Sequence, residues 1–286
     1  MQNAKKSLIE ILDIKDVIVN IVDIGASYLE GEGEAIYKNL FATGQIKVIG
    51  FEPSQVQLDI LNKRKGPNEI YLPYAIADGK SHTLNICYAA GMTSILEPNF
   101  DVLECFHGWT DWAKVIERIP LETKKLDDID EIKEMDFLKI DIQGGELLAL
   151  ENSIEKLKTC LVIQTEVEFL EMYKNQPLFA DVANFLKSQG FIFHSFTGLA
   201  KKMVIPLSKA DDFYAGLNQI LWTDAIFIRD FKKPKEVMNK EQLIKYAIIL
   251  HDLYSSYDIV LRTLFALDNN YQTNYVVKYT EFLSKN

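Results

Sequence analysis

The chain has 286 residues, of which 48% are hydrophobic and 11% aromatic, and it carries a net charge of −10. This much apolar surface can form a sizeable core, which excludes an intrinsically disordered chain. The sequence has no dense Lys/Arg block, which disfavours a nucleic-acid partner, and no apolar run of about 18 residues, which excludes a membrane span.

Strands and helices are predicted to alternate along the chain. Continuous apolar runs rich in β-branched residues predict buried strands, and apolar residues three and four apart predict helices. The strands are expected over residues 17–25, 47–53, 70–78, 137–143, 160–169, 191–196 and 222–230, and the helices over 28–44, 53–66 and 177–190. Residues 81–89 alternate and predict an exposed or edge strand. This alternation indicates an α/β fold with a mainly parallel sheet and right-handed crossovers.

Two segments lie outside this alternation. Residues 95–120 form an aromatic-rich insertion, which is either a lid over a binding site or a small satellite core. Residues 234–286 contain two amphipathic helical patterns, interrupted near Ser255 and Ser256, and either pack on the main domain or form a homodimer contact. We therefore expect a short helical segment over 1–16, a main domain over 17–233 and a C-terminal helical appendage over 234–286.

The N-terminal stretch MQNAKKSLIEILDIKD has charges among its apolar positions and does not read as a secretory signal. We expect a cytoplasmic protein. Its three cysteines, Cys87, Cys105 and Cys160, are widely spaced and form no CxxC pair, so we predict that all three are buried free thiols.

Acidic residues stand at the carboxyl ends of successive predicted strands, which is where open α/β sheets bind their ligands. Glu52 is placed to accept hydrogen bonds from both hydroxyls of a ribose, and Asp78 from an adenine amino group; a helix-capping role is the alternative for Glu52. The strand-end acids are Asp23, Glu52, Asp78, Asp141, Glu166 and Glu168.

The first strand-to-helix turn, GASYLEGEG, lacks the G-x-G-x-x-G spacing of a dinucleotide site. Glu30, Glu32 and Glu34 would repel phosphates, which favours a cationic or zwitterionic ligand. S-adenosylmethionine has a ribose, an adenine, an ammonium group and a sulfonium but no phosphate, and therefore fits this turn.

The strings IVDIGAS, GFEPS, AIAD, GMTSI, ETKKLDDI and FLKIDIQGGELLALENS resemble, in this order and spacing, the FkbM family of S-adenosylmethionine-dependent methyltransferases. The resemblance covers about residues 18–230. It implies a class I methyltransferase fold, Rossmann-like, with a seven-stranded mostly parallel sheet and an antiparallel last strand. The chain departs from the family pattern at Gln143, where Glu is frequent, and at Gly145, where Ala is frequent.

The resemblance implies that Asp23, Gly25 and Glu52 contact the cofactor and that Ala77 and Asp78 flank its adenine. The full set that we assign to the cofactor is Asp23, Gly25, Ala26, Ser27, Glu52, Pro53, Ala77, Asp78, Ser94 and Asp141. The family commonly methylates hydroxyl groups of glycans or natural products, so the expected partner is a small-molecule or glycan acceptor.

A hydroxyl nucleophile gains from a base that removes its proton. Asp141 is our first choice, and a structural acid bonded to the following turn is the alternative for it. Glu166 and His194 are further catalytic candidates, with a buried structural histidine as the alternative for His194. We predict that Glu166 and Glu168 point to opposite faces of their strand, so that only one of them faces the cleft.

Glu168, Trp222 and Asp224 are assigned to the acceptor site, with ordinary packing as the alternative for Trp222. An oxygen-rich Mg²⁺ site at Asp141 and Glu166 is an alternative, but we assign no metal ligand. Lys139 is expected to pair with an acid across the sheet. Two rival functions stay open: a non-catalytic methyltransferase-like binding module and an NAD-dependent oxidoreductase.

Overall fold

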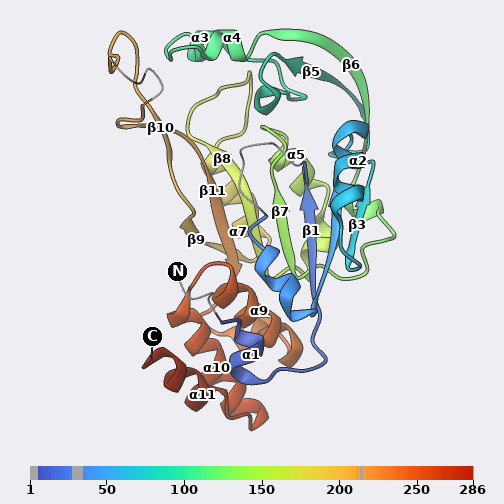
Figure 1. The fold of residues 1–286 in the computed structure, drawn as a ribbon, viewed down its shortest axis with the longest axis vertical. Coiled ribbons are helices and arrows are strands. Elements are labelled where there is room, and N and C mark those ends of the chain that lie inside the picture. The colour runs from blue at the N-terminus through green and yellow to red at the C-terminus, as the bar shows by residue number, and fades with distance from the viewer. Residues whose placement is uncertain (1–5, 28–34, 211, 213–214, 286) are drawn as a thin grey trace.

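The computed structural model describes residues 6–27, 35–210, 212 and 215–285. The molecule has three layers (Figure 1). A small sheet and short helices lie at the top, the main sheet lies in the middle, and the first and last helices form the bottom layer.

The main sheet contains eight strands within the described residues, and β3-β2-β1-β7-β8 are parallel neighbours. β11 runs antiparallel to β8 and pairs on its other side with β9 and β10. The strands are β1 (Val19–Ile24), β2 (Ile46–Phe51), β3 (Glu69–Leu72), β7 (Phe137–Ile140), β8 (Val162–Glu168), β9 (Phe191–Phe196), β10 (Ala200–Lys202) and β11 (Gln219–Arg229). The expected mostly parallel sheet with an antiparallel last strand is confirmed. The described residues add one strand, β10, to the seven expected, because β11 is long enough to pair with it beyond β9.

The two faces of the sheet have separate apolar cores. One face packs against α5 (Glu146–Glu151), α6 (Ile154–Leu157) and α7 (Phe179–Ser188). The lower half of the other face packs against α1 (Leu8–Leu12), α9 (Lys240–Asp252), α10 (Tyr257–Tyr271) and α11 (Tyr275–Leu283). The break between α9 and α10 falls at residues 253–256, where the helical pattern of the sequence is interrupted. A short helix, α8 (Pro234–Val237), precedes them.

The connections after β1 and β2 contain η1 (Lys38–Thr43) and α2 (Gln55–Arg64), and α2 lies on the right of Figure 1. The helix expected over 28–44 begins outside the described residues, and its described part contains only the 3₁₀ turn η1.

The top layer is a second sheet, in the order β4-β6-β5. Its strands are β4 (Ala75–Ile76), β5 (Ser81–Cys87) and β6 (Val115–Lys124), accompanied by η2 (Ala90–Met92), α3 (Phe100–Leu103), α4 (Trp109–Trp112) and η3 (Leu126–Asp128). The single strand expected over 70–78 is therefore divided between the two sheets. Phe106 and Trp109 of the 95–120 segment are buried in a satellite core with Cys87, Met92 and Tyr173.

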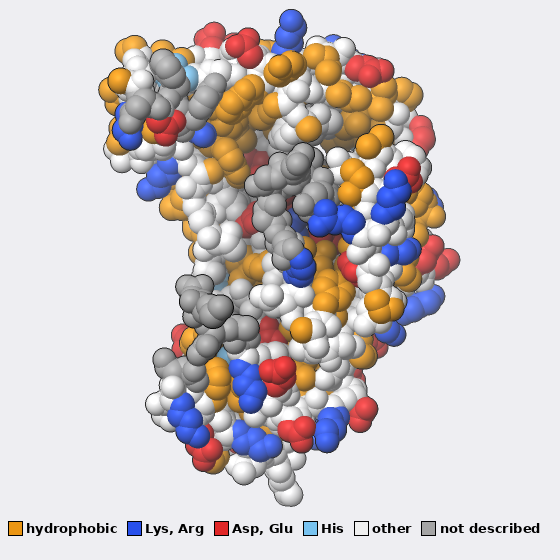
Figure 2. Space-filling model, viewed as in Figure 1, with side chains coloured by type: hydrophobic (Ala, Val, Ile, Leu, Met, Phe, Trp, Pro, Cys, Tyr) orange, Lys and Arg blue, Asp and Glu red, His pale blue; other side chains and the backbone are white. Residues whose placement is uncertain are grey.

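Hydrophobic side chains gather over the top layer, whereas charged side chains cover the helical layer at the bottom (Figure 2). Cys87 and Cys160 are buried free thiols as predicted, but Cys105 is exposed, because it follows α3 on the outside of the satellite core. In the part of the chain that the structure describes, no helix combines the length and the apolar character needed to cross a bilayer.

Candidate active site

A cavity of about 620 Å³ lies at the carboxyl ends of β1, β2 and β7, beneath the small sheet. Its apolar wall comes from β5 and β6 through Leu84, Ile86, Ile119 and Leu121. Seven of the residues predicted from the sequence line it: Gly25, Ser27, Glu52, Pro53, Ala77, Ser94 and Asp141. Residues that are far apart in the chain therefore meet at one site.

Gly25 allows the first strand to reach this cavity. Its φ is +80°, in the region that residues with a Cβ rarely adopt, and an added Cβ would lie 2.0 Å from the carbonyl oxygen of Asp141. The carboxyl ends of β1 and β7 approach this closely only because residue 25 is glycine.

Glu52 is 6% exposed, and its carboxylate lines the cavity at the end of β2. One of its oxygens, Oε1, accepts a hydrogen bond of 2.7 Å from the backbone N–H of Ser54, the N-cap residue of α2. Burial raises the pKa of Glu52, and this hydrogen bond opposes the rise. The two expected roles, cavity acid and support of a helix start, are thus compatible.

Gln57 is a lining residue that the sequence did not single out. Its Oε1 is buried and has no hydrogen-bond partner among the described residues. An unpaired buried acceptor is costly, so this atom favours a ligand that donates a hydrogen bond. Together with Glu52, it gives this end of the cavity two acceptors for hydroxyl or amino groups.

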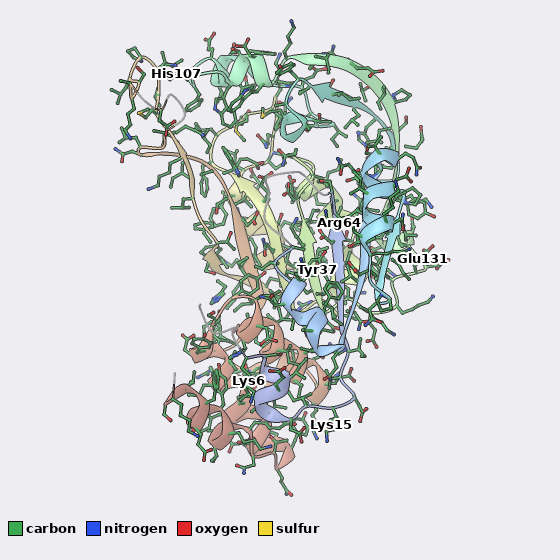
Figure 3. All side chains as sticks on the ribbon, in the orientation of Figure 1. Lys6, Lys15, Tyr37, Arg64, His107 and Glu131 are labelled. Carbon is green, nitrogen blue, oxygen red and sulfur yellow. The ribbon has the colours of Figure 1, made fainter. Side chains whose placement is uncertain are left out.

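Asp23 is buried beneath the cavity and does not line it. Its Oδ2 accepts a hydrogen bond of 2.6 Å from the hydroxyl of Tyr37, labelled in Figure 3, and its Oδ1 lies 3.7 Å from Lys139 Nζ. Burial alone would lower the pKa of Lys139, but the neighbouring carboxylates, Asp23 and Asp141 first, raise it above its ordinary value. Lys139 therefore remains charged and pairs with an acid, as expected, and it also lines the cavity.

Asp141 is held from two sides. Its Oδ2 lies 3.9 Å from Lys139 Nζ, and its Oδ1 accepts a hydrogen bond of 2.9 Å from Gln143 Nε2. Gln143 Nε2 also donates to Glu166 Oε2 at 3.1 Å. The amide of Gln143 thus joins the carboxylate in the cavity to one behind it.

Buried acids stand behind Asp141. Burial raises the pKa of Glu146 at the start of α5 to about 7, and a hydrogen bond of 2.8 Å from the N–H of Ile142 opposes this rise. Burial and repulsion from neighbouring acids raise the pKa of Glu166 and Glu168 well above their ordinary range. Burial and mutual repulsion thus favour the protonated form of these acids.

The prediction that Glu166 and Glu168 point to opposite faces is wrong. Side chains two residues apart lie on the same face of a strand. The registers of β8 agree, because Glu166 pairs with Asp224 and Glu168 with Trp222 across β11. All four side chains therefore share the face that carries Lys139.

Neither acid of β8 lines the cavity, and the same holds for the residues of β11 assigned to the acceptor. Asp224 Oδ2 accepts a hydrogen bond of 2.6 Å from Gln164 Nε2, and burial raises its pKa. Trp222 packs on Trp109, with ring centroids 5.5 Å apart. Trp222 therefore packs against the satellite core and does not line the cavity.

Three further predicted residues, Asp78, Ala26 and His194, do not line the cavity. Asp78 binds Nε2 of His82 at 2.7 Å, and this contact, with Lys80, lowers its pKa. Ala26 is buried, and its N–H donates to Phe51. His194 Nε2 lies 2.7 Å from the hydroxyl of Ser256 at the start of α10, and burial lowers its pKa. We do not retain His194 as a catalytic candidate.

The acids of this site include a group that could hold a metal ion. Carboxylate oxygens of Asp141, Glu146 and Glu166 lie within 4.8 Å of one another. However, the Nε2 hydrogens of Gln143 point at Asp141 and Glu166 from between them, where they would repel a cation. We therefore assign no metal ligand.

Sequence reasoning missed Gln57, the role of Gln143 as a bridge, and Glu146. Glu146 looks like an ordinary acid of a first helical turn, which favours negative charge in any helix. The apolar wall of β5 and β6 did have a signal in the sequence. Along each of these strands, the apolar residues that face the cavity alternate with exposed residues.

The sequence model of a family described as methyltransferase FkbM domain matches residues 23–193, more than half of the chain. No curated protein matches the sequence.

Solved structures show weaker similarity. A magnesium protoporphyrin IX methyltransferase from Synechocystis with bound SAM has a TM-score of 0.39 at 10% identity and covers 75% of this chain and 71% of its own. A putative tRNA (m1A22) methyltransferase from Streptococcus pneumoniae has a TM-score of 0.34 at 13% identity, with 96% of both chains covered. At these scores the similarities carry no argument about this chain.

Proposed function

The chain belongs to the family of FkbM-domain methyltransferases, and from that premise we propose that it transfers a methyl group from S-adenosylmethionine to a hydroxyl group of a saccharide or natural product. The observation that carries the proposal is the cavity at the strand ends, where Gly25, Glu52 and Asp141 come together.

The residues at the β2 end of the cavity suit the nucleoside part of the cofactor. Glu52 and Gln57 Oε1 are acceptors for ribose hydroxyls, and the apolar wall of Leu84 and Ile119 suits a flat ring. When bound, the cofactor supplies an activated methyl group on its sulfonium.

The residues at the β7 end suit the chemistry. Asp141 is a carboxylate in the cavity, and its contacts with Lys139 and Gln143 fix the orientation of both oxygens. We infer that Asp141 accepts the proton of the acceptor hydroxyl, which makes the oxygen a better nucleophile. Positioning of the acceptor supplies most of the remaining rate.

The first experiment is calorimetry with S-adenosylmethionine. The wild type binds it, and Glu52→Ala weakens binding by about 100-fold or more, because charge-assisted hydrogen bonds are worth roughly 1.5–3 kcal/mol each. Glu131→Ala, an exposed acid at the other end of the sheet (labelled in Figure 3), binds as the wild type does. No binding to the wild type at millimolar cofactor overturns the proposal.

The second experiment is turnover with methyl-labelled cofactor and a panel of glycans and polyhydroxylated small molecules. We expect label on a hydroxyl oxygen. At saturating cofactor, Asp141→Asn slows turnover by about 100-fold or more, the usual contribution of a positioned base. Label found only on nitrogen acceptors contradicts O-methylation and leaves the cofactor assignment intact.

A further inference from the structure

Gln143 lies in the wall of the cavity, but its amide cannot act as a base. Its backbone has φ of 58°, in the left-handed region that side chains other than Asn and Asp rarely adopt. Such a conformation costs of the order of 1 kcal/mol, which a glycine would not incur. A side chain kept at a strained position points to a use for that side chain.

The strained position is anchored from the top layer. Ser94 is 1% exposed, and its hydroxyl donates a hydrogen bond of 2.6 Å to the carbonyl oxygen of Gln143. The same hydroxyl accepts a bond of 3.0 Å from the N–H of Leu96. Ser94 itself is bridged to Asn85 of β5. The backbone of residue 143 is therefore held from the small sheet, independently of its side chain.

The side chain uses this position to join two carboxylates. One amide nitrogen donates to Asp141 at 2.9 Å and to Glu166 at 3.1 Å, so both of its hydrogens are used. The reversed amide would place its oxygen against two carboxyl groups, which the hydrogen-bond pattern disfavours.

We propose that Gln143 is a positioning residue, whose amide holds the Asp141 carboxylate in the cavity against Lys139 and separates it from Glu166. This inference rests on the proposed function, because it assigns Gln143 a part in presenting Asp141 to cofactor and acceptor. The amide also gives the two neighbouring acids a shared hydrogen-bond donor.

Charged and titratable groups face this cluster from each packed strand and from α5. They are Lys139 of β7, Asp23 of β1, Glu146 of α5, Glu166 and Glu168 of β8, and Asp224 of β11. A carboxylate in place of the amide would stand within hydrogen-bond distance of two others, and like charges at such distances do not all ionise. The carboxyl introduced at residue 143 would therefore hold a proton at neutral pH.

The first test needs no ligand and follows thermal unfolding from pH 5 to pH 8. In Gln143→Glu, a carboxyl with a raised folded-state pKa costs stability as the pH rises above its ordinary value. We expect its melting temperature to fall by about 5 °C across this range relative to a control. The control is Gln272→Glu, an exposed glutamine with φ of 53° at the end of α10. Parallel profiles for the two variants overturn the proposal.

The second test measures S-adenosylmethionine affinity in Gln143→Met, which removes the donor without adding charge. We expect about tenfold weaker binding, whereas Gln272→Glu binds as the wild type does. Wild-type affinity in Gln143→Met overturns the positioning role. If the wild type binds no cofactor, the proposed function fails, and the unfolding profile still decides whether Gln143 joins the two carboxylates.

Discussion

Gly25→Ala tests whether the close approach of β1 and β7 builds the cavity. Two costs add. The backbone of residue 25 has φ of +80°, and a side chain in the left-handed region costs roughly 1–2 kcal/mol. The new Cβ would also lie 2.0 Å from the Asp141 oxygen and 3.3 Å from Cγ2 of Ile142. Since ordinary contacts are about 3.5 Å, the strand ends must separate by more than about 1 Å.

Overpacking of this kind costs roughly 1–3 kcal/mol, so the free energy of unfolding should fall by about 2–5 kcal/mol in total. Gly44→Ala separates the two costs. Gly44 has φ of +70°, but nothing described lies within 4 Å of an added Cβ, so only the conformational cost applies. Urea unfolding of both variants should give a difference of about 1–3 kcal/mol between them.

Cofactor affinity tests whether the separation of the strand ends also disturbs the cavity. Displacement of the Asp141 backbone should weaken S-adenosylmethionine binding in Gly25→Ala by about tenfold or more, whereas Gly44→Ala keeps wild-type affinity. Equal destabilisation of the two variants together with normal binding in Gly25→Ala would refute the reasoning.

Two further predictions concern buried charges. In the wild type, the Glu146 carboxyl stays protonated up to its folded-state pKa of about 7, so stability falls as pH rises from its ordinary value of 4.5 towards 7. Glu146→Gln should flatten this slope in urea unfolding, and an unchanged slope would contradict the assignment. Lys245 is 3% exposed and lies 3.2 Å from the buried Asp136. Lys245→Met should lower the free energy of unfolding by about 3 kcal/mol, because it leaves a buried charge unpaired. Lys233 pairs with Glu236 at the surface, so Lys233→Met should lower it by under about 1 kcal/mol in the same assay.

The main sheet could be predicted because its strands are continuous apolar runs with few other ways to bury themselves. In the small sheet, only β5 could be predicted, from the strand pattern over residues 81–89. β4 has only two residues, Ala75 and Ile76, and it is a strand because Thr123 and Lys124 pair with it. Pairing between residues almost 50 positions apart leaves no local pattern in the sequence.

Some residues of the site could likewise be predicted from the sequence, and others could not. Glu52 and Asp141 could be placed at the cavity because each directly follows a core strand. Asp78 also follows a predicted strand, but His82, four residues on, takes up its carboxylate. Which partner captures an acid depends on side-chain geometry, and strand order alone does not decide it.

On the sheet face that carries Lys139, side-chain alternation alone shows where apolar residues give way to polar ones. On each of four strands, an apolar residue that packs on the helical layer is followed two positions nearer the cavity by a polar one. The pairs are Ile21 and Asp23, Phe137 and Lys139, Val162 and Gln164, and Ile226 and Asp224. Residues two apart share a face, so the changes on β1, β7 and β8 mark one line across the sheet. On β11 the change lies two residues nearer the cavity, because Ile226 pairs with Gln164.

The helical layer ends at that line. The hydroxyl of Tyr254, which follows α9, donates a hydrogen bond of 2.8 Å to Gln164 Oε1. Nearer the cavity, the face carries Asp141, Glu166 and Glu168, which must satisfy one another or bind a ligand because buried polar groups without partners are costly. Lys139 and the amide of Gln143 both contact Asp141 on this acidic face, which is why the loss of either should disturb the site.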